Sequence, residues 1–231
     1  MPDKKTYKVL PLKSSQSGWH TRGYLPHLEK QHLLQSVTFR LHDAVPQKYL
    51  LRLEQKLLNM EEEKAEIIRR QKIEEMMDKG RGACHLRNPQ VARIVEDALL
   101  ALDPMRYRLI AWAIMPNHVH LQLALSPGTL LGATIRSIKN YSARRANLLL
   151  GQSGTFWFPD YYDRYIRDPR HFYACLNYIE RNPCKVGLCR SPSDWPFSSA
   201  RRRADPPEDG GIIFPTMEDL VADCHERLRK E

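Results

Sequence analysis

The chain has 231 residues, a formal net charge of +9 at pH 7 and an isoelectric point of about 9.4. This length can bury a full hydrophobic core, and we expect one domain with appendages rather than two domains. The excess of Lys and Arg is compatible with binding a polyanion, although charge alone does not single out nucleic acid. The five cysteines include no Cys-x-x-Cys pair, which argues against a disulfide framework or a zinc cluster.

Nothing in the sequence predicts export or a membrane anchor. Residues 1–21 are polar and rich in Lys and Ser, without the apolar segment that signal peptides carry. No stretch of the chain approaches the ~20 apolar residues of a membrane-spanning helix. We therefore expect a soluble, unexported protein with reduced thiols in a cytosol, no membrane partner, and a flexible basic tail over residues 1–21.

The first predicted elements are a strand and a long charged helix. Over residues 36–41, Val37, Phe39 and Leu41 alternate with more polar neighbours, which predicts a half-buried strand. Residues 46–79 are rich in Glu, Lys, Leu and Met and predict a long helix or a broken one. Their apolar residues keep no single stripe, so we expect a solvated arm rather than a coiled coil.

A turn and an amphipathic helix come next. Gly80-Arg81-Gly82 has the composition of a turn, and Asn88 followed by Pro89 is typical of a helix N-terminus. Apolar residues then recur with helical spacing over residues 89–102. We expect this helix to pack on a sheet.

Two apolar segments, residues 106–114 and 118–125, are separated by Met-Pro-Asn and predict a β-hairpin. Side chains alternate between the faces of a strand, so His118, His120 and Gln122 share one face and the apolar residues of their strand share the other. Two imidazoles on one face can bind one metal ion or one phosphate. The alternative is two histidines with satisfied hydrogen bonds on a half-exposed strand.

The following helix, predicted over residues 130–150, has a polar face that consists of Arg136, Lys139, Asn140 and Arg144. This face predicts phosphate contacts or, alternatively, an ordinary solvated surface.

Residues 154–168 combine aromatic and basic side chains, among them Trp157, Arg164 and Arg167. Aromatic rings can stack on unpaired bases while arginines neutralise the backbone, as in proteins that bind single strands. Some of these rings are expected in the core instead.

A third helix is predicted over residues 170–182, with Asp168 as its N-cap. Tyr178 and Asn182 are four residues apart and therefore share a face of this helix. A proline follows Asn182, so we expect Asn182 at the fraying end of the helix.

These elements predict an α+β fold. Its antiparallel sheet contains the strands 36–41, 106–114 and 118–125, and the helices 89–102 and 170–182 pack on it. The C-terminal region over residues 204–231 is predicted to be a Pro- and Gly-containing linker followed by a short helix over residues 217–229, with Thr216 and Asp219 as candidate caps.

The sequence resembles the REP-associated tyrosine transposases, a branch of the single-tyrosine HUH transposases. Met115-Pro116-Asn117-His118-Val119-His120 resembles the metal-binding stretch of that family, and Tyr178-Ile179-Glu180-Arg181-Asn182-Pro183 resembles its nucleophile helix. Shorter similarities lie at residues 22–27, 37–41, 156–157, 163–168 and 194–201. The resemblance implies an HUH-endonuclease-like catalytic domain over residues 22–203, with a ferredoxin-like palm and the 46–79 helix as an insertion.

The resemblance also implies the residues of an active site. Tyr178 would attack a DNA phosphate, and His118, His120 and Asn182 would bind a divalent metal. Many single-tyrosine relatives carry Gln as the third ligand, whereas Asn is the type associated with the REP-associated branch. Nitrogen and oxygen ligands without thiolates favour Mg²⁺ or Mn²⁺. The implied activity is cutting and rejoining of single-stranded or hairpin DNA through a 5′-phosphotyrosine, in a bacterial-type cytosol and associated with the nucleoid.

Three alternatives stay open at this point. The pattern from His118 to Gln122 also resembles the histidine-triad nucleotide transferases, in which a histidine attacks a nucleotide phosphate. A second alternative is a DNA-binding protein that descends from a transposase and no longer cuts. Tyr141, on the 130–150 helix, is a second candidate nucleophile. The sequence leaves undecided whether the protein is a monomer or a homodimer, and which group accepts the tyrosine proton.

Overall fold

The computed structural model describes residues 19–21, 26–28, 34–206 and 215. Its centre is a four-stranded antiparallel sheet with the strand order β4-β5-β3-β6. The strands are β3 (Leu34–Arg40), β4 (Tyr107–Ile114), β5 (His118–Leu125) and β6 (Tyr162–Tyr165). The predicted α+β class and antiparallel sheet are confirmed.

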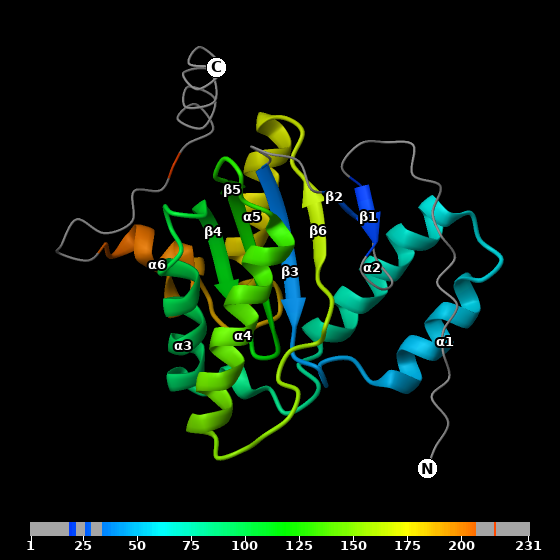
Figure 1. The fold of residues 1–231 in the computed structure, drawn as a ribbon, viewed down its shortest axis with the longest axis horizontal. Coiled ribbons are helices and arrows are strands. Elements are labelled where there is room, and N and C mark those ends of the chain that lie inside the picture. Colours follow the sequence, from blue (N-terminus) through cyan, green and yellow to red (C-terminus); the bar gives the residue numbers. More distant parts are fainter. Residues whose placement is uncertain (1–18, 22–25, 29–33, 207–214, 216–231) are drawn as a thin grey trace.

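Helices cover both faces of this sheet (Figure 1). Helices α3 (Pro89–Leu100) and α4 (Leu131–Leu149) lie on one face, and α5 (Pro169–Lys185) lies on the other. The remaining elements are α1 (Gln47–Leu57), α2 (Glu62–Asp78), α6 (Ser199–Ala204), the 3-10 helices His85–Arg87 and Pro192–Asp194, and a separate pair of strands, β1 (Trp19–Thr21) and β2 (Pro26–Leu28).

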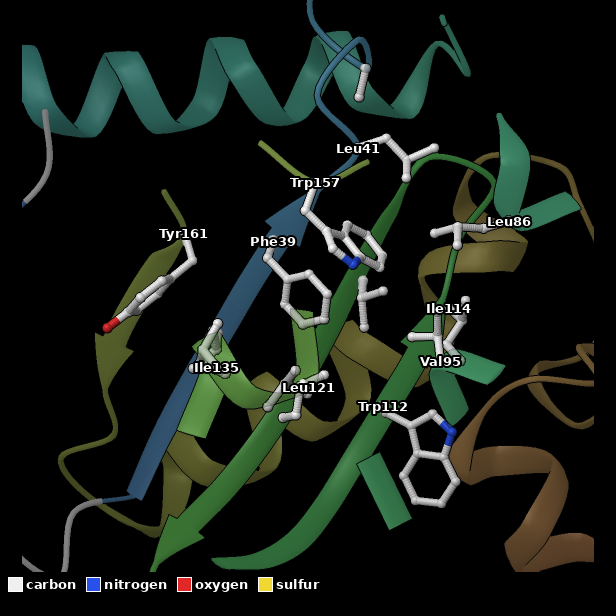
Figure 2. Close-up of a cluster of buried hydrophobic side chains, with 14 of the residues drawn as sticks. Phe39, Leu41, Leu86, Val95, Trp112, Ile114, Leu121, Ile135, Trp157 and Tyr161 are labelled. Carbon is white, nitrogen blue, oxygen red and sulfur yellow. The ribbon is translucent and has the colours of Figure 1, made fainter. Parts of the chain in front are cut away.

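Strand β5 divides its side chains between the two faces as its alternation predicts. Val119 and Leu121 are fully buried in the main hydrophobic cluster together with Ile135 of α4. Figure 2 shows Leu121 and Ile135 in this cluster beside Trp112 and other core side chains. The histidines of β5 therefore face away from α3 and α4, towards α5.

Both predicted helix caps are present. The Asn88 side chain accepts a hydrogen bond from the Gln90 backbone N–H at 3.0 Å, and the Asp168 side chain accepts one from the His171 N–H at 2.8 Å. Each cap satisfies a backbone donor that has no partner within the helix. The predicted turn at residues 80–82 is also observed, with left-handed backbone at Gly82, where a Cβ atom would lie 2.7 Å from the Asp43 carbonyl oxygen.

The prediction of a solvated arm over residues 46–79 is wrong. The segment forms two helices, α1 and α2, and apolar residues from both belong to the main hydrophobic cluster. These residues are Leu53, Leu57, Ala65, Ile73, Met76 and Met77. The break explains the missing stripe only in part, because α1 has an apolar stripe of its own whereas the apolar residues of α2 keep none even within that helix.

The prediction that Asn182 lies at a fraying helix end is also wrong. Helix α5 continues through Pro183 to Lys185, and Asn182 is fully buried. Its carbonyl oxygen accepts a hydrogen bond from the Val186 N–H at 3.3 Å, and the Pro183 carbonyl accepts one from the Leu188 N–H at 2.9 Å. These bonds and the burial of the side chain outweigh the preference of a residue before proline for extended backbone.

Predictions for the chain ends fall mostly outside the described residues. This holds for the tail up to residue 18 and for the terminal helix over 217–229 with its caps Thr216 and Asp219. Residues 19–21, predicted as part of the flexible tail, instead form β1 and pair with β2. Among the described helices, none is long and apolar enough to span a bilayer. The four cysteines in the described part of the chain are free thiols.

Candidate active site

The turn between β4 and β5 fixes the first histidine. The Asn117 side-chain nitrogen donates to the backbone oxygens of Met77 at 3.2 Å and Arg81 at 2.9 Å. This leaves Asn117 Oδ1 to accept from Nδ1 of His118 at 2.7 Å. A proton on Nδ1 leaves the lone pair of the neutral imidazole on Nε2. Asn117 therefore orients His118 and presents Nε2 as a ligand atom.

The second histidine is oriented from β3. Nδ1 of His120 lies 2.8 Å from the Thr38 hydroxyl oxygen, and Nε2 of His120 lies 3.0 Å from Nε2 of His118. Two ligand atoms at right angles around an ion, each at the ~2.1 Å of octahedral coordination, would be about 3.0 Å apart. The spacing of the two nitrogens therefore fits one shared divalent ion.

Both imidazoles are held neutral. Burial is the main cause that lowers the pKa of His118 well below its ordinary value, with smaller contributions from His120 and Lys185. Burial and the Lys185 charge lower the pKa of His120 to about 3. Only a deprotonated imidazole can bind a metal, so this environment keeps the pair ready for an ion over the physiological pH range.

Helix α5 brings the tyrosine and the asparagine to the same place. The Asn182 side-chain nitrogen donates to the Tyr178 hydroxyl at 3.1 Å, and the Tyr178 ring lies edge-on to His120 with 5.7 Å between centroids. This bond uses the amide nitrogen, and among the described residues the buried Asn182 Oδ1 has no hydrogen-bond partner. A buried carbonyl oxygen on the residue that bonds Tyr178, whose ring contacts His120, fits the third ligand of a hard cation. Tyr178 itself is 37% exposed, so a large substrate can reach it.

The predicted ligand set contains only two residues of the common metal-binding types. In the described ranges, no group of three or more His, Cys, Asp and Glu side chains could hold an ion. Two imidazoles and one amide oxygen therefore make up the donor set, with further positions left for water or substrate oxygens. The buried Oε1 of Gln122, on the same strand face as the histidines, also has no hydrogen-bond partner.

A cleft of about 300 Å³ opens beside Tyr178 and His120. Strands β3, β5 and β6 form its floor, and α2 and α5 form its walls. The residues that line it are Ser36, Thr38, Arg70, Glu74, Met77, His120, Tyr162, Asp163, Arg164, His171, Ala174, Cys175 and Tyr178. At one end Lys185 of α5 pairs with Asp78 of α2 at 3.0 Å, and the Lys185 ammonium lies 5.5 Å from the centre of the Tyr178 ring.

Of the predicted DNA-binding residues, the structure brings only Arg164 into this cleft. Arg136, Asn140 and Arg144 are exposed on α4, which packs on the opposite face of the sheet. Tyr141 is exposed on the same helix and is thus separated by the sheet from the histidine pair. Arg167 is exposed just before α5.

Two of the predicted DNA contacts are wrong. Lys139 is buried, and its ammonium donates to the backbone oxygens of Phe158, Pro159 and Asp160 at 2.6, 2.8 and 3.3 Å. Trp157 lies in the hydrophobic core (Figure 2), and its indole N–H donates to the Ser142 hydroxyl at 2.9 Å. Lys139 and Trp157 both tie residues 157–160 to α4, so the ammonium and the indole N–H are engaged within the protein.

Sequence reasoning missed the contribution of α2. Arg70, Glu74 and Met77 line the cleft, although their segment was predicted to be solvated. The i, i+4, i+7 spacing of these three residues was visible in the sequence, but it does not indicate which element the face contacts. Asn117 was present in the Met-Pro-Asn-His motif, and only the structure gives it the role of orienting His118.

Comparisons with known proteins point to one family. A sequence model described as "Transposase IS200 like" matches residues 90–182, which include both histidines, Tyr178 and Asn182. The REP-associated tyrosine transposase of Escherichia coli (strain K12) is 29% identical over 97 residues, or 42% of this chain and 56% of that relative. The chain thus aligns with little more than half of the length of this curated relative.

One solved structure shares the fold of this chain. A structure of a REP-associated tyrosine transposase bound to a REP hairpin covers 86% of this chain and 96% of its own, with a TM-score of 0.53 and 19% identity. A putative transposase from Deinococcus radiodurans R1 covers 71% of this chain and 96% of its own at 17% identity, but its TM-score of 0.32 is too low to compare folds.

The part of the chain that carries the histidine pair and Tyr178 thus matches the model of IS200-like transposases. The resemblance found in the sequence is confirmed, since the chain is similar to REP-associated tyrosine transposases in sequence and in fold.

Proposed function

We propose that this protein is a metal-dependent transposase that cuts and rejoins single-stranded or hairpin DNA through a 5′-phosphotyrosine intermediate. One observation carries the proposal. The Nε2 atoms of His118 and His120 are 3.0 Å apart, and the ring of Tyr178, whose hydroxyl accepts a hydrogen bond from Asn182, lies 5.7 Å from the His120 ring and lines the same cleft. The REP hairpin bound to the related transposase supports hairpin DNA as the substrate class.

In the proposed reaction Tyr178 is the nucleophile. Its hydroxyl oxygen forms a bond to the phosphorus of the scissile phosphate, its proton passes to an acceptor, and the bond from phosphorus to the 3′ oxygen breaks. The 3′ oxygen takes up a proton and leaves as a free hydroxyl. Reversal of these steps rejoins the strand without an external energy source, because the phosphotyrosine keeps the energy of the phosphodiester.

His118, His120 and Asn182 would hold the ion, with Mg²⁺ or Mn²⁺ matching nitrogen and amide oxygen ligands. When bound, the ion supplies Lewis-acid polarisation of the phosphate. Asn117 and Thr38 keep the two imidazoles in the orientation that such binding needs. Asn182 has a second role, since its amide nitrogen positions the Tyr178 hydroxyl.

The proposal is tested by finding the residue that becomes attached to DNA. Labelled hairpin oligonucleotides with single-stranded flanks are incubated with protein and Mg²⁺, and the covalent adduct is isolated on a denaturing gel and mapped by mass spectrometry. We expect the adduct on Tyr178 and its complete loss in Tyr178→Phe, which removes only the oxygen. Tyr173→Phe is the matched control, because Tyr173 is an exposed tyrosine of the same helix that does not line the cleft.

Other outcomes would select the alternatives. An adduct that survives in Tyr178→Phe and is lost in Tyr141→Phe would place the nucleophile on α4. A nucleotide attached to a histidine would indicate a histidine-triad transferase. Binding of the hairpin without any adduct in the wild type, over a range of divalent ions, would indicate a DNA-binding protein that does not cut.

A further inference from the structure

Helix α2 turns a defined face towards the proposed active site. Arg70, Glu74 and Met77 have i, i+4, i+7 spacing and all line the cleft that contains Tyr178. Residues 62–78 lie outside the region that the family model matches, residues 90–182. The role of this wall therefore has to be inferred from its own side chains.

The cleft has two different ends. At one end the ion pair between Lys185 and Asp78 joins α5 to α2. At the other end the charges of Arg70 and Arg164 both act on His171, in the first turn of α5. Tyr178 lies between these ends, seven residues after His171 along the helix. At 1.5 Å per residue this separation is about 10 Å.

The second end collects positive charge, with the carboxylates of Glu74 and Asp163 lining the same cleft. In the described part of the chain, neither Arg70 nor Arg164 makes an ion pair. Partial burial, followed by the charge of Arg70, lowers the pKa of Arg164. The buried Nε2 of His171 has no hydrogen-bond partner there. Two guanidinium groups that line one cleft without an ion-pair partner are stabilised when an anion binds between them.

We propose that Arg70 of α2 and Arg164 of β6 bind one backbone phosphate of the DNA strand that passes Tyr178. This inference rests on the proposed function for the identity of the strand. A separation of about 10 Å along α5 places this phosphate apart from the one that is attacked but within a few nucleotides of it. Helix α2 thus forms one wall of the DNA site, and the guanidinium of Arg70 can donate two parallel hydrogen bonds to the phosphate.

The test measures binding separately from cutting. Affinity for a fluorescein-labelled hairpin with single-stranded flanks is followed by fluorescence anisotropy at several salt concentrations, in a Tyr178→Phe background that cannot form the adduct. For Arg70→Gln and Arg164→Gln we expect about tenfold weaker binding at low salt. We also expect the slope of log K against log salt to fall by up to about 0.7, the value for one phosphate of a single strand.

Matched variants separate phosphate binding from a structural role. Arg52→Gln is the control, because it removes the same charge from an exposed position of α1 that does not line the cleft beside Tyr178. It should leave the salt slope unchanged. Arg70→Lys keeps the charge and should retain most of the slope, whereas a purely structural role of the arginine would not be rescued.

Uncharged substitutes for single DNA phosphates show which phosphate the two arginines contact. Replacing single phosphates of the oligonucleotide by methylphosphonates should reveal one position, near the cut but distinct from the attacked phosphate, at which neither Arg70→Gln nor Arg164→Gln weakens binding further. Slopes equal to that of Arg52→Gln, or the absence of any such position, would overturn the inference. If these effects appear while wild-type protein forms no adduct, the phosphate site stands and only the proposed cutting activity fails.

Discussion

The two faces of the central sheet treat polar groups in opposite ways. On the side of α3 and α4, the Trp112 indole N–H donates to Glu96 at 3.1 Å, and Glu96 pairs with Arg93 at 2.7 Å and Arg202 at 3.2 Å. On the side of α5, Oδ1 of Asn182 and Oε1 of Gln122 are buried without a partner. Unsatisfied buried oxygens destabilise a fold unless something else binds them.

This difference separates the parts of the molecule that stabilise the fold from those that perform chemistry. Strand β5 contributes to both, since His120 and Leu121 are neighbours in sequence and point to opposite faces. The face with satisfied polar groups and apolar packing supports the fold. The face with neutral imidazoles, and with oxygens that lack a partner among the described residues, carries the groups that we propose bind a cation and a phosphate.

The largest expected effect is that of His120→Ala or His118→Ala. Loss of either imidazole removes one ligand from a set of three and should lower the cleavage rate at least about 10³-fold, the size of a several-kcal/mol loss of Lewis-acid stabilisation. Hairpin binding should change by no more than about threefold, because affinity comes mainly from phosphate contacts elsewhere. Single-turnover cleavage and anisotropy on the same preparations measure the two quantities.

The neighbouring Leu121→Ala is the control for this experiment. It should lower the free energy of unfolding by about 2–5 kcal/mol, because it leaves a cavity in the main cluster, while the folded fraction keeps its cleavage rate. If both substitutions mainly lowered stability, or if His120→Ala still cleaved at the wild-type rate, the division between the two faces would be wrong.

A smaller effect is expected for Asn117→Ala. This substitution keeps all three proposed ligands but removes the acceptor that orients His118. It also removes the two hydrogen bonds to the backbone oxygens of Met77, near the end of α2, and Arg81. Groups that orient a metal-bound histidine typically contribute 10- to 100-fold to metal affinity or activity. We expect a loss in that range, partly reversed by raising the Mn²⁺ concentration. A loss that no metal concentration reverses would mean that Asn117 supports the fold only.

The part of this organisation that depends on local pattern could be predicted from the sequence. Alternation along residues 118–125 gave the correct division of β5, and the four-residue spacing gave the shared face of Tyr178 and Asn182. Contacts between distant segments could not be predicted. Lys139 has the same helical pattern as an exposed lysine, and its burial depends on three carbonyl oxygens about 20 residues further along the chain.

Helix α2, which forms one wall of the cleft, is a second case in which the residue pattern of the sequence was not enough to predict the contacts. Arg70 is half-buried in the cleft, and a helix with charges on several sides looks solvated when its neighbours are unknown. The same limitation applies to Asn182, since the effect of the following proline could be predicted locally, whereas the burial that outweighs it depends on tertiary packing.

The smallest expected effect concerns Glu74. It tests whether burying this carboxylate in the cleft lowers the free energy of unfolding. Burial, more than the nearby Asp78, raises the pKa of Glu74 above its ordinary 4.5, and Lys185 and Arg70 oppose this. The folded state therefore binds more protons than the unfolded state from pH 4.5 up to the raised pKa, and the stability contribution of Glu74 falls as the pH rises through this window. Glu74→Gln stays neutral, so it should be more stable than wild type at pH 7 and equal to it near pH 4.

Glu75→Gln, on the next residue, provides a control of opposite sign. Hydrogen bonding to Lys72 lowers the pKa of Glu75, so this carboxylate contributes stability above pH 4.5 that is lost as the pH falls through its folded pKa. Glu75→Gln should therefore be slightly less stable than wild type at pH 7, with the difference vanishing in acid. Urea unfolding of both variants between pH 4 and 7 measures the two trends. If Glu74→Gln followed the trend of Glu75→Gln, the cleft wall would stabilise the fold, and the contrast between the two faces would not extend to α2.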